Sequence, residues 1–156
     1  MTVTQFLWFA KNAEEAVKLY TSLIPGSEMG KVTTFHSESP SGPPGSVKTI
    51  EFTLAGIPYR ALEAGPLDDF NHAFSIQVNC ETQEEIDRLW DALGKGGRHE
   101  PCGWLKDKYG LSWQIVPRLL EELAGGPDKA QAKRVTDAMM KMGKIEIAGL
   151  KAAAKG

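Results

Sequence analysis

The sequence predicts an α+β fold made of two βαβββ modules and a helical tail. Strand-like and helix-like segments follow one another in the order βαβββ over residues 1–65, and the same order returns over residues 72–118. The helices of the two halves are also alike: residues 14–23 align without a gap with residues 84–93, and each segment begins with Glu-Glu and ends with Leu. Such similarity indicates a duplicated supersecondary unit.

The first half opens with residues 2–9, which alternate with the period of a strand. A helix follows, for which Asn12 is the predicted N-cap, with two glutamates in the first turn and Pro25-Gly26 at its end. Three further strands are predicted at residues 29–35, 46–54 and 57–64.

The second half repeats this pattern from residue 72. A strand at residues 73–79 leads to a helix that Thr82 caps and Gly96-Gly97 ends. Tyr109-Gly110 is the predicted hairpin turn between the last two strands. The extended segments that complete the module are residues 98–102, 104–108 and 111–117.

Residues 119–156 differ in character and form the predicted helical extension. They are rich in Ala, Lys, Met and Leu, and helices are predicted at residues 119–123, 128–142 and 145–153. An apolar stripe within the second helix indicates a docking face; its members are Ala132, Val135, Met139 and Met142.

Composition narrows the classes of partner. The chain has 156 residues and a formal net charge of −2, which provides no field strong enough to attract nucleic acid or an anionic membrane. The first residues lack the pattern of a secretory signal, and the two cysteines, Cys80 and Cys102, are too few for a disulfide framework. We therefore expect a cytoplasmic protein with reduced thiols and a small-molecule ligand.

Several segments resemble the vicinal-oxygen-chelate superfamily of glyoxalases, bleomycin-resistance proteins and dioxygenases, in particular its PhnB-like branch. These segments are residues 7–9, 13–16, 80–85, 102–107, 109–114 and 139–150. The resemblance implies a curved mixed sheet with a pocket on its concave face, and a homodimer. Some relatives carry the label 3-demethylubiquinone-9 3-methyltransferase. However, the sequence has no glycine-rich strand-to-helix loop of the kind that binds a nucleoside cofactor, so methyl transfer is not predicted.

In metal-dependent members of that superfamily, the first and last strands of each module supply the ligands. By position, the resemblance points to Gln5 and Gln114, and on the fourth strand to either Leu62 or Glu63, of which only Glu63 could bind a metal. In the strand that opens the second module, the residue equivalent to Gln5 is Ala73 if the modules are aligned by strand pattern, and Ser75 if they are aligned by the helix repeat.

These residues predict a pocket without a strongly bound metal, because neutral amides are poor ligands for a divalent ion. Glu63 is the predicted general base, and the predicted ligand contacts are Gln5, Ser75, Gln114 and Trp104. A divalent metal would have only weak candidate ligands, namely Gln5, Glu63, His72 and Gln114. An alternative is that Gln5 and Gln114 satisfy each other or nearby backbone, and that His72 is a solvated loop residue.

Three functions follow as hypotheses. The first is an enzyme that acts on a substrate with adjacent oxygens, as a lyase, an isomerase or a dioxygenase-type enzyme. The second is a protein of the bleomycin-resistance kind that binds a small molecule without chemistry. The third is an interaction module in which the helical extension docks a partner.

Overall fold

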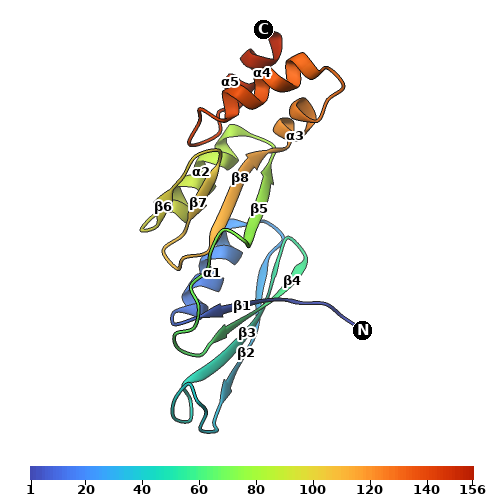
Figure 1. Ribbon diagram of the computed structural model, residues 1–156. Coiled ribbons are helices and arrows are strands. Elements are labelled where there is room, and N and C mark those ends of the chain that lie inside the picture. Colours follow the sequence, from blue (N-terminus) through green and yellow to red (C-terminus); the bar gives the residue numbers. More distant parts are fainter. The chain divides into compact units, whose positions relative to one another are not determined.

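The computed structural model describes residues 1–156, which divide into two compact units, residues 1–69 and residues 70–156. Each unit contains one four-stranded mixed sheet with a helix packed on it (Figure 1). The predicted α+β class with two βαβββ modules is therefore confirmed.

The first unit has the strand order β1-β4-β3-β2. Strand β1 runs parallel to β4, whereas β3 is antiparallel to both β4 and β2. Its elements are β1 (Gln5–Phe9), α1 (Ala13–Leu23), β2 (Glu28–Phe35), β3 (Val47–Leu54) and β4 (Ile57–Glu63).

The second unit repeats this topology with the strand order β5-β8-β7-β6, again with its first and last strands parallel. Its module elements are β5 (Ser75–Cys80), α2 (Gln83–Gly94), β6 (Arg98–His99), β7 (Trp104–Lys106) and β8 (Ser112–Pro117). Strand β6 is shorter than predicted because Cys102 and Gly103, with φ of 62° and 80°, turn the chain before β7.

In each module the helix covers one side of the sheet, and side chains alternate between that side and an open side. In the first module, the buried side includes Leu7 and Phe9 on β1, Ile50 on β3 and Ala61 on β4. The open side carries Phe6, which is 55% exposed, and Arg60, which pairs with Glu51. Because side chains alternate along each strand and a helix covers one side of the sheet, each module has one core face and one open face on which a site could form.

The start of α1 differs from the prediction. Asn12 adopts a left-handed conformation (φ 63°), and its side chain makes no capping hydrogen bond. Instead, the backbone N–H of Ala13 donates to the carboxylate of Glu63 on β4, at 2.8 Å. Asn12 thus occupies the predicted N-cap position, but a distant carboxylate, which is favourable at a helix N-terminus, replaces its side chain as the cap.

The start of α2 agrees with the prediction. The Thr82 hydroxyl accepts from the backbone N–H of Glu85 at 3.2 Å, and the Glu85 carboxylate accepts from the N–H of Thr82 in return. This capping box satisfies two N–H groups that the helix itself leaves unpaired.

The extension folds as three helices: α3 (Arg118–Ala124), α4 (Lys129–Met139) and α5 (Ile147–Lys155). Val135, Ile145 and Leu150 are fully buried at its centre, with Met139 and Met142 packed against them, so the predicted stripe is a docking face. None of the helices combines the length and the apolar character that a membrane span requires.

The extension is tied to the second module through backbone groups. The N–H groups of Cys102 and Gly103 donate to the carbonyl oxygens of Met142 and Gly143, each at 2.8 Å. On α2, the Gln83 side chain donates to the carbonyl of Ile145 and accepts from the N–H of Ile147. These contacts make residues 119–156 part of the second unit.

Asp107 organises the hairpin between β7 and β8. Its side chain is only 3% exposed, yet both carboxylate oxygens are engaged. Oδ1 accepts from the backbone N–H groups of Tyr109 (2.8 Å) and Leu111 (3.1 Å), and Oδ2 accepts from the indole N–H of the fully buried Trp113 at 2.9 Å. Three donors offset the cost of burying this charge.

We expect Asp107→Asn to destabilise the protein by about 1–3 kcal/mol, because the amide cannot accept from both sides and leaves a buried donor unpaired. Urea denaturation would measure the change. Asp68→Asn, at an exposed position, is the matched control and should leave the unfolding free energy almost unchanged. Equal stability of the two variants would contradict the role given to Asp107.

Gly103→Ala should cost more stability than Gly110→Ala, although both glycines have a positive φ. A methyl group at Gly103 would lie 2.7 Å from the Ile115 carbonyl oxygen and 3.1 Å from Ile145 Cγ1, whereas nothing lies within 4 Å of one at Gly110. The Gly110 variant therefore shows the backbone strain alone, about 1 kcal/mol. Thermal denaturation of both variants would test this, and an equal loss of stability would refute it.

Candidate functional site

The two candidates on the first module do not meet. Gln5 pairs with Tyr59 at one end of the parallel strands β1 and β4, and Glu63 pairs with Phe9 at the other end. Four residues of extended chain separate the two positions, which is about 13 Å. By alternation, both residues also share the helix-covered side with Leu7 and Phe9, not the open side on which a pocket was expected.

The pairing register settles the choice between Leu62 and Glu63. Leu62 is the partner of Trp8 and lies on the open side, so the position expected to face a ligand holds an aliphatic side chain. The Glu63 carboxylate is bound to the N-terminus of α1. The structure thus gives Glu63 a capping role, and its assignment as a general base stays a prediction.

The second module brings its candidates together on the open side of its sheet. The side-chain amide of Gln114 on β8 donates to the Ser75 hydroxyl on β5 at 2.9 Å. Gln114 is also the cross-strand partner of Trp104 on β7. Gln114 is therefore satisfied by Ser75, not by Gln5. The other candidate for the Ser75 place, Ala73, lies before β5 begins.

His72, which precedes β5, lies against this open face with both ring nitrogens engaged. Nδ1 is 3.0 Å from the hydroxyl oxygen of Ser112, and Nε2 is 3.0 Å from a carboxylate oxygen of Glu100. A carboxylate only accepts, so the neutral imidazole donates from Nε2 to Glu100 and accepts from Ser112 at Nδ1. His72 is therefore anchored at both nitrogens, and 48% of its side chain is exposed in the loop before β5.

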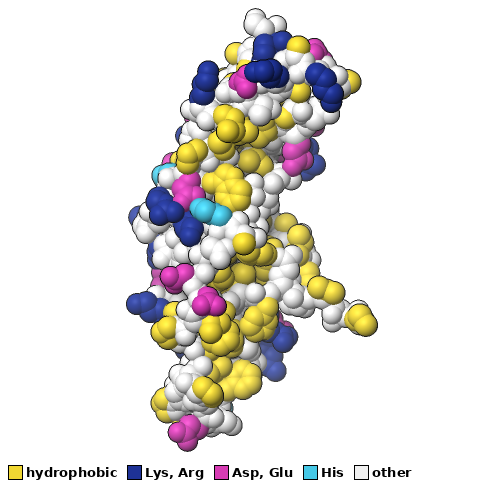
Figure 2. Space-filling model, in the orientation of Figure 1, with side chains coloured by type: hydrophobic (Ala, Val, Ile, Leu, Met, Phe, Trp, Pro, Cys, Tyr) yellow, Lys and Arg dark blue, Asp and Glu magenta, His cyan; other side chains and the backbone are white.

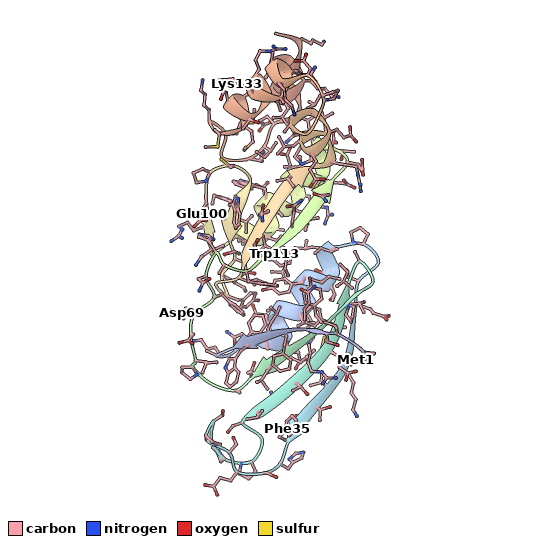
Figure 3. The ribbon with its side chains drawn as sticks, turned by 45° about the vertical axis from the view of Figure 1, so that its right-hand side comes forward. Met1, Phe35, Asp69, Glu100, Trp113 and Lys133 are labelled. Atoms are coloured by element: carbon pink, nitrogen blue, oxygen red, sulfur yellow. The ribbon has the colours of Figure 1, made fainter.

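A hollow of about 310 Å³ opens beside this imidazole, lined by His72, Glu100, Pro101 and Trp104. The His72 and Trp104 rings meet edge to face, with centroids 5.4 Å apart. In Figure 2 a histidine lies among basic and acidic side chains over β6 and β7, and Figure 3 shows Glu100 on this flank of the second unit. The volume fits a small ligand.

Arg98 completes the charge arrangement. Its guanidinium donates to the other carboxylate oxygen of Glu100, with Nε at 2.8 Å, and the Glu100 side chain is only 14% exposed. A hydrogen-bonded line therefore runs from Arg98 through Glu100 and His72 to Ser112.

This line differs from the triad of an acyl-transfer enzyme. Ser112 is fully buried beneath His72, so its hydroxyl cannot reach a substrate carbonyl. Its role is to hold the imidazole from one side while Glu100 holds it from the other.

Sequence reasoning missed Ser112 and Glu100. Ser112 lies two residues before the candidate Gln114 and shares its side of β8, whereas Glu100 lies near no position that the sequence singled out. The alternation of β8 could have identified Ser112. Glu100 could not be found this way, because its contact with His72 joins a loop to a segment outside any strand.

The two thiols lie in different environments. Burial raises the pKa of the Cys80 thiol to about 11, so this side chain remains a protonated, unreactive thiol at neutral pH. Cys102 is half-buried, and its sulfur lies 3.9 Å from that of Met140.

The donor set does not fit a divalent metal. No three His, Cys, Asp or Glu side chains come together in a way that could hold an ion. Of the weak candidates, Glu63 caps a helix, Gln114 is bonded to Ser75 and His72 is bonded at both nitrogens. The absence of a strongly bound metal stays a prediction, and no step proposed below depends on a metal.

Solved structures with this fold come from several bacteria. A PhnB protein from Bacillus cereus that carries the label 3-demethylubiquinone-9 3-methyltransferase is 35% identical, with a TM-score of 0.63, over 75% of this chain and 99% of that one. The fosfomycin resistance protein FosX of Listeria monocytogenes is 16% identical, with a TM-score of 0.55, over 78% of this chain and 94% of that one. The latter likeness shows the fold alone.

No curated protein matches the chain. A family model does: that of 3-demethylubiquinone-9 3-methyltransferase matches residues 1–116, which include both βαβββ modules. The chain therefore belongs to this PhnB-like family of the glyoxalase, or vicinal-oxygen-chelate, superfamily.

Proposed function

We propose that the protein binds a small molecule in the hollow beside His72 and that His72 exchanges a proton with it through Nε2, when the ligand takes the place of the Glu100 carboxylate at that nitrogen. The observation that carries this proposal is an imidazole fixed at both nitrogens and placed against a cavity with an aromatic wall. Imidazole is the side chain whose charge changes most readily near neutral pH, which suits it to general acid–base chemistry.

Glu100 and Ser112 are the positioning residues of this proposal. For Nε2 to take a proton from the ligand, the neutral imidazole carries its own proton on Nδ1, where the Ser112 hydroxyl accepts it, and the Nε2 lone pair faces the ligand. Arg98 binds the other carboxylate oxygen of Glu100 and holds it in place. The imidazolium that forms keeps the Ser112 hydroxyl at Nδ1 and has the Glu100 carboxylate beside it, so its charge is stabilised.

Proton transfer next to an oxygen-bearing carbon is the chemistry of isomerases and lyases, and we propose this reaction class. Methyl transfer is not proposed despite the family label. The strand-to-helix connections, Ala10-Lys11-Asn12 and Glu81-Thr82, contain no glycine that could let a backbone approach a nucleoside cofactor.

A second candidate function is binding without chemistry, which the position of Trp104 favours. Its large ring lines the hollow and can pack on a flat ligand without any proton transfer. The homodimer that the resemblance implies also stays a prediction, which the molar mass in solution would check.

The choice of probes follows from the fold. A FosX structure holds Mn(II) and 1S,2S-dihydroxypropylphosphonic acid, a compound with adjacent oxygens. For the present chain, we would use this compound, glycerate and catechol as small molecules with adjacent oxygens.

The prediction is that at least one probe shifts the NMR signals of the His72 ring and the Trp104 indole at millimolar concentration. His72→Gln should weaken binding of this probe about tenfold, because it removes the hydrogen bond between the imidazole and the probe. His36→Gln, in an exposed loop of the first unit, is the matched control and should bind as the unaltered protein does.

The outcomes separate the two functions. Exchange of a carbon-bound proton of the probe with D₂O, lost in His72→Gln, supports the enzyme. Binding without exchange supports the binding protein instead. If no probe shifts either residue, both versions of the proposed site are wrong.

A further inference from the structure

We infer that the ligand of this site is an oxyanion and that Lys106 selects it. The inference rests on the proposed function and names its substrate class: a small carboxylate, phosphonate or phosphate.

The first step is the place of Lys106 on the sheet. It follows Trp104 by two residues on β7, so both side chains leave the strand on the open side. Its cross-strand partner on β8 is Ser112, whose hydroxyl contacts His72. Lys106 thus adjoins both the aromatic wall and the imidazole.

The second step is that the charge of Lys106 is not compensated. The only partner of its ammonium group is the backbone carbonyl of Phe70, a neutral acceptor, at 3.3 Å. Asp107, the next residue, cannot serve, because its carboxylate is committed to the hairpin and to Trp113 on the helix-covered side. A half-buried ammonium group without a carboxylate favours an anion nearby.

The third step is the net charge of the site. Arg98 and Glu100 form an ion pair and neutralise each other. Lys106 therefore leaves the open face around the hollow with one positive charge when His72 is neutral and two when it is protonated. Such a field attracts small anions and repels cations of the same size.

A purely structural role for Lys106 is the competing explanation. The hydrogen bond to Phe70 ties down the segment that carries His72. Lys106→Gln separates the two explanations, because glutamine keeps an N–H donor for this carbonyl but removes the charge. Lys106→Arg keeps both the donor and the charge. The matched control is Lys108→Gln in the adjacent hairpin, where the lysine lies over the Tyr109 ring.

The experiment measures the affinity of four probes by NMR titration of the His72 and Trp104 signals: glycerate, 1,2-dihydroxypropylphosphonate, inorganic phosphate and the neutral analogue glycerol. In the unaltered protein, the anions with adjacent oxygens should bind about tenfold tighter than glycerol, since one charge-assisted hydrogen bond is worth about that factor. The two anionic analogues distinguish a carboxylate ligand from a phosphonate, and phosphate shows whether the anion alone suffices.

In Lys106→Gln this advantage should disappear, whereas glycerol binding stays unchanged. Lys106→Arg should retain most of the advantage, Lys108→Gln should retain all of it, and 0.5 M NaCl should reduce it.

Equal affinity for glycerate and glycerol in the unaltered protein would overturn the inference but leave the proposed site standing. An anion advantage that survives in Lys106→Gln would do the same. If no probe, charged or neutral, shifts His72 or Trp104, the proposed function itself fails, and this inference fails with it.

Discussion

The buried carboxylate of Asp107 is the interaction on which the candidate site depends. By accepting from two backbone N–H groups of the turn and from the Trp113 indole, it fixes both the length of the hairpin and the register of β7 against β8. That register places Lys106 opposite Ser112 and Trp104 opposite Gln114. A shift of one residue would turn each of these side chains to the other side of the sheet. The polar face of the second module is thus a consequence of one buried charge.

The two modules share a topology but cap the N-terminus of their helices in different ways. Helix α2 is capped by residues next to it, Thr82 and Glu85, whereas α1 is capped across the sheet by Glu63. The first solution is local and can be seen in the sequence. The second one uses a residue fifty positions away, and it engages the carboxylate that the sequence offered as a general base. Duplication conserved the scaffold, while the polar constellation belongs to the second copy alone.

This difference explains how far the sequence could predict the structure. Hydrophobic periodicity and the repeated Glu-Glu helix were sufficient for the order of elements, because both are local properties. The site required the side of the sheet on which each residue lies. In β1, both faces are largely apolar, so alternation could not tell which side Gln5 would take. On β4, the choice between Leu62 and Glu63 needed the pairing with β1. His72 and Glu100 lie outside the strands, and only tertiary contacts bring them together.

The turn at Cys102 and Gly103 lies between the hollow and the helical extension, and neighbouring residues of this segment contact one or the other. Glu100 and Pro101 line the hollow, while the next two N–H groups are held by the carbonyl groups of Met142 and Gly143. The family model ends at residue 116, but the unit that supports its second module continues to the end of the chain. A gene fragment cut at the boundary of sequence similarity would therefore encode the eight strands except Pro117, the last residue of β8, and would lack the backbone groups that hold one wall of the site. The residues that the family model matches, 1–116, are therefore fewer than the residues that a stable second module requires, which extend to residue 156.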